Sequence, residues 1–220
     1  MNEIITVTGK GKISLPPDTV QINIAVEIIC DTYEETMGAS AAAITEIRDA
    51  LKQGAFKKED LKTRRFRVDL EYESYKENDN YKRRFVGYKC NHDLKIEFSS
   101  NGGRLARVLY LIARCPINPE LSIKYKINDM EEAKNQLLAK AVSDSKVKAE
   151  VLTNAAGVKL GKVVNINYSW GEMNIYSQPM SYNKDCFCNE VESDYESSVD
   201  IEPEDLDITD TVTVTWEITT

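Results

Sequence analysis

Two pairs of closely spaced side chains are the residues of this chain best suited to chemistry. Cys90 and His92 stand two positions apart in an alternating stretch, so a strand presents both on one face, as a thiol nucleophile and its base require. A catalytic thiol also needs a pocket, an orienting acid and a lowered pKa, and the sequence indicates none of these. We therefore interpret the pair as structural, with a thiol-dependent redox protein or enzyme as the alternative.

The second pair is Cys186 and Cys188, which could bind a thiophilic metal. Structural zinc needs four ligands at recognisable spacings, and no second pair accompanies these two thiols. His92 is the chain's one histidine, so a multi-histidine metal site is excluded as well. We assign no catalytic, cofactor-binding or metal-binding residue, and we expect no enzyme activity and no cofactor.

The five cysteines are an odd and scattered set, which is typical of a reduced compartment: Cys30, Cys90, Cys115, Cys186 and Cys188. The first residues lack the positive and apolar regions of an export signal. Both observations predict a cytoplasmic protein. No apolar run approaches the roughly 20 residues of a membrane-spanning helix, so we expect no such segment.

Charge bears on the class of partner. The formal net charge of −8 argues against nucleic-acid binding, because phosphate contacts require a basic surface. A basic run over residues 62–67 alternates with Phe66, Val68 and Leu70, which places its charges on the solvated face of a strand. We interpret this run as charged surface and predict no nucleic-acid partner.

Glycines and acidic residues suggest two further sites, and neither has the required spacing. Gly9, Gly11, Gly102 and Gly103 do not form a phosphate-binding motif, and we interpret them as residues of turns and bends. The acidic residues of 171–207 lack the register of a calcium loop. This stretch has no periodic pattern, so we expect a mobile acidic loop.

Three stretches have the periodicity and boundaries of helices. Capping boxes are predicted at residues 31–34 and 128–131, and serines at 99–100 cap a third segment. The longest helix should bury a stripe of small and apolar residues and end at Gly157 in the left-handed conformation: Leu138, Val142, Ser145, Ala149, Leu152 and Ala156. The related small-residue stripe Ala141, Ser145, Ala149 and Ala156 predicts close packing on the chain's own sheet.

Alternation of period two predicts the strands, at residues 5–8, 20–28, 66–72, 86–98, 121–127, 164–170 and 208–218. In the strand at 164–170 we expect one apolar side, including Trp170, to be half-buried. The order is ββαββαβαββ, which indicates an α+β fold with helices on one face of a mostly antiparallel sheet. We expect a single domain over residues 1–220.

Several short stretches have an order and spacing that match a known family: residues 4–11, 17–18, 59–63, 86–88, 149–161 and 212–218. They resemble the SIMPL-domain family, a family of unknown function that includes bacterial periplasmic immunogenic proteins. The resemblance covers essentially the whole chain. It implies an α+β fold with a helix-backed sheet, and some members build ring-like or hollow homo-oligomers. Most bacterial members are exported, and the family has no established catalytic residues.

Together these observations predict a non-enzymatic, self-associating scaffold or interaction protein. Its strand edges would join another copy or a protein partner, because unpaired backbone groups accept a further strand. The resemblance suggests a link to envelope or stress physiology. The alternative from another class is an adaptor that binds a protein partner through the acidic loop at 171–207.

Overall fold

The computed structural model describes residues 3–77, 80–100, 103–168, 176–182 and 202–219. The chain forms two compact units. Unit 1 comprises Met1–Pro17, Lys126–Tyr176 and Pro203–Thr220, and unit 2 comprises Asp18–Tyr125 and Ser177–Glu202. Each unit pairs an antiparallel arrangement of strands with helices, which confirms the predicted α+β class. Whether the two units unfold as the single domain that we expected stays a prediction.

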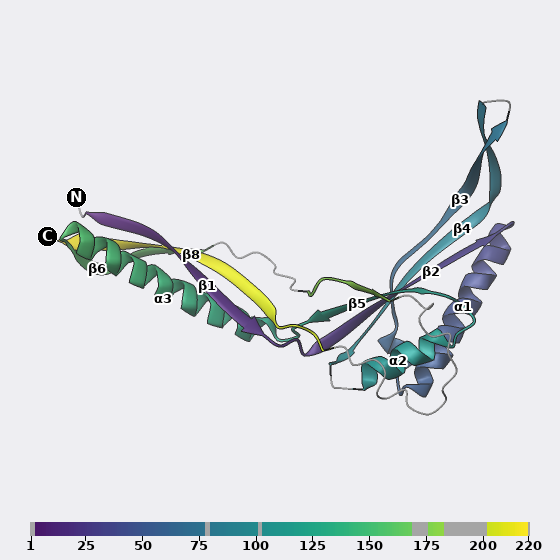
Figure 1. Ribbon diagram of the computed structural model, residues 1–220, viewed down its shortest axis with the longest axis horizontal. Coiled ribbons are helices and arrows are strands. Elements are labelled where there is room, and N and C mark those ends of the chain that lie inside the picture. The colour runs from purple at the N-terminus through teal and green to yellow at the C-terminus, as the bar shows by residue number, and fades with distance from the viewer. Residues whose placement is uncertain (1–2, 78–79, 101–102, 169–175, 183–201, 220) are drawn as a thin grey trace. The chain divides into compact units, whose positions relative to one another are not determined.

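Unit 1 is a three-stranded antiparallel sheet with one long helix on it (Figure 1). The strand order is β1 (Ile4–Leu15), β8 (Leu206–Thr219) and β6 (Lys159–Asn167). Helix α3 (Met130–Ala156) packs along β1 and β8. Alternate apolar residues of β1 and β8, among them Val7 and Val214, are buried beneath it.

The ends of α3 lie close to the predicted positions, but the N-terminus has a single side-chain cap in place of the predicted capping box. Asp129, not Asn128, is the N-cap, and its carboxylate accepts the amides of Glu131 and Glu132. Gly157 ends the helix at a φ of 74°, as predicted.

The buried stripe of α3 differs in part from the predicted one. Its members recur at steps of four: Ala133, Leu137, Ala141, Ser145, Ala149 and Thr153. Leu138 and Val142 are partly buried, and Leu152 is 51% exposed. A stripe at steps of four turns about 40° around the helix at each step, because one turn takes 3.6 residues. The contact line therefore winds across a twisted sheet, and Leu152 falls outside it.

We had predicted that Gly9 and Gly11 are turn residues. The prediction was wrong, because β1 continues unbroken through both. A Cβ atom on Gly9 would overlap the Ala141 carbonyl oxygen and the Ser145 amide of α3. A Cβ atom on Gly11 would overlap the Leu137 carbonyl oxygen. The glycines thus let the backbone of the helix approach the backbone of the strand. Of the predicted small-residue stripe, Ala141, Ser145 and Ala149 pack on the chain's own sheet, whereas Ala156 is exposed.

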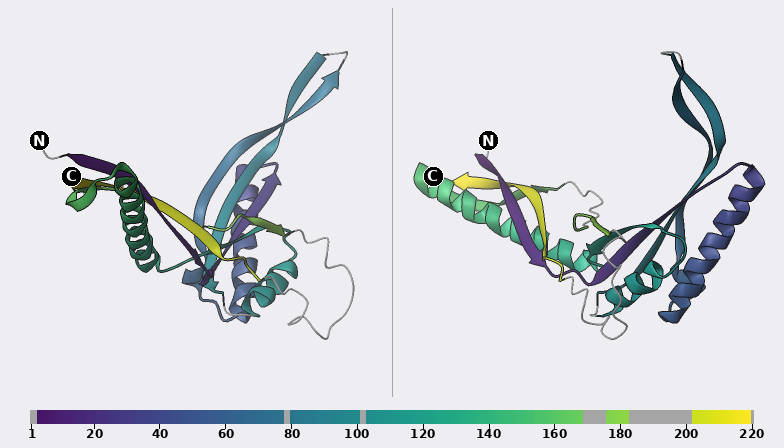
Figure 2. Two further views of the ribbon diagram at one scale, coloured as in Figure 1. Left: turned by 60° about the vertical axis from the view of Figure 1, so that its left-hand side comes forward. Right: turned by 45° about the vertical axis from the view of Figure 1, so that its right-hand side comes forward.

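Unit 2 contains a five-stranded sheet and two helices (Figure 2). The strand order is β3 (Lys62–Glu77), β4 (Asn80–Ser99), β2 (Thr19–Cys30), β5 (Glu120–Lys126) and β7 (Met180–Tyr182). The helices are α1 (Tyr33–Gln53) and α2 (Arg104–Ala113), and a short 3₁₀ turn occupies Lys58–Asp60. The capping box of α1 joins Thr32 and Glu35, one residue later than predicted.

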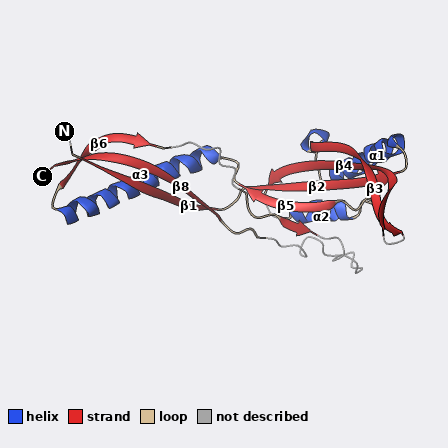
Figure 3. Ribbon diagram, turned by 90° about the horizontal axis from the view of Figure 1, so that it is seen from above, coloured by secondary structure: helices blue, strands red, loops and turns tan. Residues whose placement is uncertain are grey.

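Both helices of unit 2 contribute to one apolar core, so they cover the same face of the sheet. Ile47 of α1 and Leu109 of α2 belong to one buried cluster with Ile24 of β2 and Ile96 of β4. Each of these four side chains has no exposed surface. The one-sided helix layer predicted from the sequence is confirmed, although the strands form two sheets (Figure 3).

Strands β3 and β4 extend beyond the rest of the sheet as a two-stranded ribbon, which we call the arm (residues 70–77 and 80–88). Strand β2 pairs with β4 only as far as the pair Cys30 and Tyr88. Glu71 pairs with Gly87 and Tyr72 pairs with Phe85, so Val86 is the extra residue of a bulge in β4. Gly87 has a φ of 154°, and its Cβ would overlap the Cys30 carbonyl oxygen. The bulge and glycine therefore mark the point where β2 ends and the arm begins.

The stretch expected to be a loop at 171–207 is partly ordered into strands. Strand β7 pairs with Leu121–Ile123 of β5, and Leu206 and Asp207 belong to β8. Trp170, Cys186, Cys188 and the acidic residues at 190–200 lie outside the described residues. Among the described helices, none has both the length and the apolar character to cross a membrane.

Candidate functional site

Cys90 and His92 face α1, as strand alternation predicted, and a helix residue joins them. The Cys90 thiol donates to Ser40 Oγ at 3.5 Å, and Ser40 Oγ lies 3.3 Å from His92 Nδ1. His92 Nε2 lies 3.0 Å from Thr63 Oγ1 of β3. A thiol, a hydroxyl, an imidazole and a second hydroxyl thus form one hydrogen-bonded row across β4, α1 and β3.

This row holds α1 on the sheet more readily than it activates a nucleophile. Cys90 is 1% exposed, so a substrate cannot reach its sulfur while α1 is packed. Burial, helped by the positive charge of Arg48, lowers the pKa of His92 and favours the neutral ring. The neighbouring Asp93 carboxylate is bound to Arg65 at 3.0 Å, whereas the two ring nitrogens of His92 lie beside the hydroxyls of Ser40 and Thr63.

Ser40 is the member of this row that sequence reasoning missed. Apolar residues at helical spacing in this stretch include Met37 and Ala41, whereas the buried residues at this end of the helix are Thr36 and Ser40. Both are hydroxyl residues, which a hydropathy pattern assigns to the solvent side. The available signal was their spacing of four, which continues to Ile44 and Ile47.

In the part of the chain that it describes, the structure does not complete a metal site or a basic binding patch from the other residues considered in the sequence. Among the described cysteines, Cys30, Cys90 and Cys115 form no disulfide with one another. The described residues contain no group of three or more His, Cys, Asp or Glu side chains that could hold a metal ion. The basic run of β3 is ion-paired surface: Arg67 binds Asp69 at 2.7 Å, and Arg64 donates to Asn23 at 3.1 Å.

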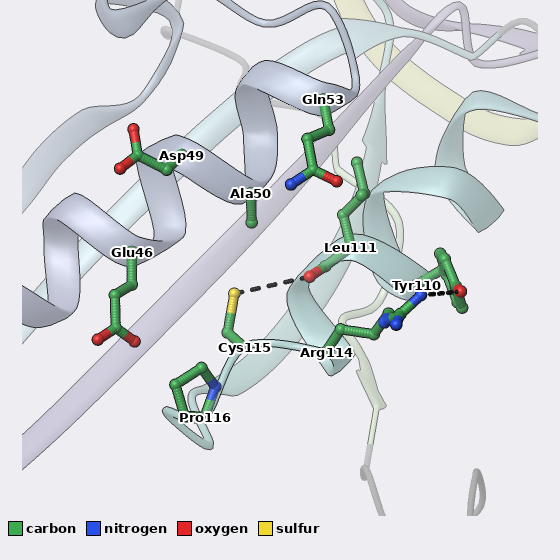
Figure 4. Close-up of a pocket in the computed structure, with 9 residues that line it drawn as sticks. All are labelled: Glu46, Asp49, Ala50, Gln53, Tyr110, Leu111, Arg114, Cys115 and Pro116. Carbon is green, nitrogen blue, oxygen red and sulfur yellow. Dashed lines mark hydrogen bonds between the residues drawn. The ribbon is translucent and has the colours of Figure 1, made fainter.

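A cleft of about 510 Å³ lies between α1 and the end of α2 (Figure 4), lined by Glu46, Asp49, Ala50, Gln53, Tyr110, Leu111, Arg114, Cys115 and Pro116. Several of its polar groups bind one another or their neighbours. Arg114 donates to the Tyr110 hydroxyl at 2.6 Å, and Asp49 pairs with Lys52 at 2.6 Å. The Cys115 thiol donates to the Leu111 carbonyl at 3.6 Å. The cleft therefore offers few groups that point to a particular ligand.

Strand edges are the remaining candidates for function, and the edge of β1 is covered. Along this edge the Lys148 ammonium donates to the Thr8 carbonyl at 3.3 Å, and the Lys10 amide donates to the Asp144 carboxylate at 2.7 Å. Lys140 donates to the Lys12 carbonyl at 3.3 Å. A hydropathy pattern assigns Lys140, Asp144 and Lys148 to the solvent side of α3. Instead, spaced at four, they occupy backbone groups that an added strand would need.

The edge at the opposite side of the same sheet, β6, is apolar, and no strand of the described residues pairs with its outer side. We had predicted that one side of this strand is half-buried, yet every residue from Lys162 to Asn167 is exposed. Val163, Val164 and Ile166 are 39%, 53% and 47% exposed. In unit 2, β7 is only three residues long and β3 carries charges on one face. An exposed apolar edge is the kind of strand that pairs with another chain.

The comparisons with known proteins agree with the resemblance seen in the sequence. The family model SIMPL, described as a protein of unknown function (DUF541), matches residues 5–216. The chain belongs to the SIMPL family. Two curated SIMPL-like relatives are the 26 kDa periplasmic immunogenic proteins of Brucella melitensis biotype 1 and Brucella abortus (strain S19). Each is 27% identical over 164 residues, which is 74% of this chain and 65% of the relative.

The chain thus spans slightly less than two thirds of these relatives' length. The name of these relatives places them in the periplasm, which conflicts with the cytoplasmic location expected for this chain. The SIMPL match and the α+β fold agree on the family. Neither identifies a ligand, a reaction or a partner.

Proposed function

We propose that this SIMPL protein is a non-enzymatic scaffold that self-associates by strand addition at β6. The observation that carries the proposal is the contrast between the two edges of the unit 1 sheet. Side chains of α3 bind the backbone of β1, whereas β6 presents valine and isoleucine to solvent. Strand addition supplies affinity through backbone hydrogen bonds, and exposed apolar side chains add buried area.

The absence of catalysis is part of the same proposal. Cys90 and His92 are occupied in the row that joins α1 to the sheet, and the α1–α2 cleft directs its polar groups at one another. The adaptor alternative uses the acidic stretch at 171–207, of which residues 171–175 and 183–201 lie outside the described part of the chain. Cell fractionation decides between the periplasm of the named relatives and the cytoplasm expected from the cysteines.

Light scattering on the purified chain tests the scaffold. We expect a mass that is a multiple of 24.9 kDa for the wild type and at most half that mass for Val164→Lys/Ile166→Lys, because lysines on an edge oppose pairing. Ile4→Lys is the matched control, since Ile4 is 54% exposed and lies on β1 of the same sheet. A monomeric wild type, or a double variant of unchanged mass, would refute the proposal.

A further inference from the structure

The arm has two chemically different faces. On one face, the charged residues of β3 and β4 are ion-paired, as in the Arg84–Glu73 contact at 2.6 Å. The opposite face carries exposed rings and one leucine, which we call the aromatic face: Leu70, Tyr72, Tyr81 and Phe85, with exposed fractions of 42–81%. A two-stranded ribbon is marginally stable in water by itself. Its apolar face is thus a surface that gains from being covered.

The aromatic face continues a surface that α1 already covers. Tyr72 packs edge-to-face on Phe85 at 5.8 Å, Phe85 on Tyr88 at 5.5 Å, and Tyr88 on Tyr33 at 5.8 Å. Tyr33 is the first residue of α1. The row of rings therefore runs from the arm to the start of the helix, and beyond that point the face has no cover within the described residues. A second helix laid on the rings would extend the packing that α1 begins.

The chain itself contains a helix surface with the complementary chemistry. Val147 and Val151 of α3 are 55% and 62% exposed and stand one turn apart, opposite the stripe that packs on β1. We call these two residues the valine ridge. β-Branched residues weaken a solvent-exposed helix slightly, so packing rather than helix propensity accounts for them here.

Charge supports the same match. Arg83, on the arm, stacks on the Tyr72 ring with its guanidinium carbon 5.1 Å from the centroid. By strand alternation Arg83 lies on the aromatic face, opposite Ser74. The exposed carboxylate of Glu150 lies beside the valine ridge and has only a long contact, at 3.9 Å, with Lys146. If α3 of another copy packs on the rings, the Glu150 carboxylate comes close to the Arg83 guanidinium.

We propose that the aromatic face of one copy packs on the valine ridge of a second copy. The inference rests on the proposed self-association and uses a different surface from β6. Because one copy contributes the arm and the other contributes α3, the two partners use unlike patches. Each copy then has one patch of each kind left to offer.

Mixing two variants tests this contact in the Val164→Lys/Ile166→Lys background, where β6 is blocked. The arm variant adds Tyr72→Glu/Phe85→Glu, and the ridge variant adds Val147→Glu/Val151→Glu. We expect each variant alone to have a mass of 24.9 kDa, and an equimolar mixture to form a complex of twice that mass, because the mixture restores one intact contact. The changed residues are at least 42% exposed, and circular dichroism checks that the variants fold.

The control is Tyr75→Glu in the same background, because Tyr75 is 39% exposed and lies on the charged face of the arm. It should leave the mass of its parent unchanged. A mixture that stays at the monomer mass overturns the inference, and so does a variant that self-associates alone. Failure of the β6 proposal has a separate outcome. In that case the Val164→Lys/Ile166→Lys parent itself has the same mass as the wild type.

Discussion

Gly9→Ala should destabilise unit 1 by about 3 kcal/mol. The new methyl group occupies the space of the Ala141 carbonyl and the Ser145 amide, so α3 must move away from β1. Overpacking of this kind costs roughly 1–3 kcal/mol. The retreating helix also weakens the Lys10–Asp144 and Ser145–Val7 hydrogen bonds, at about 0.5–1.5 kcal/mol each. Replacing a strand glycine with alanine returns only about 0.5–1 kcal/mol.

Urea unfolding followed by circular dichroism measures the change in the free energy of unfolding. Gly38→Ala is the matched control, since Gly38 is an exposed residue inside α1 and an added Cβ meets nothing within 4 Å. That variant should gain about 0.5–1 kcal/mol, because glycine is a poor helix former. If Gly9→Ala stays within about 0.5 kcal/mol of the wild type, the helix does not pack backbone-to-backbone on β1 and our reasoning is wrong.

Further outcomes concern acid, histidine and thiol chemistry. Hydrogen bonds from Lys148 and the Lys10 amide hold the pKa of Asp144 below its ordinary 3.8, so its contribution is complete above about pH 4 and is lost below it. The stability gap between wild type and Asp144→Asn should therefore close in acid, as read by urea unfolding. Burial lowers the pKa of His92 below 6.5, so the unfolded chain gains a proton first and stability falls as the pH drops through 6.5. In His92→Gln the free energy of unfolding should depend less on pH in this range. Cys90→Ser should self-associate as the wild type does in light scattering. If the wild type has an enzyme activity that Cys90→Ser loses, the result would favour the enzyme alternative.

Periodicity predicted the elements well because it reports on local backbone geometry. The long helix, its glycine end and the alternating strands appear where the sequence placed them, with capping residues displaced by one position at Thr32 and Asp129. Adjacent residues at both caps have side chains able to accept the helix amides, so type alone does not select between them. The strand β7 was missed because three residues carry too short a pattern.

Burial was harder to predict because it depends on which elements meet. Alternation in β6 showed that the strand has an apolar side, but the side is exposed since α3 lies over β1 and β8. The same absence of partner information hid the role of Gly9, whose neighbour lies 132 or more positions away in the sequence. Ser40 was missed for a related reason: a hydroxyl is polar in water, yet here it is satisfied by Cys90 and His92.

The Lys140–Asp144–Lys148 contacts with β1 also limit how far strand addition can proceed. With the β1 edge occupied, the edge of unit 1 that remains for a strand arriving at β6 is the β6 edge of its partner. Such a pairing is isologous and closes on a twofold axis after two copies, so sheets of unit 1 do not stack edge to edge into fibrils. One helix therefore gives the fold a built-in stop against amyloid-like growth.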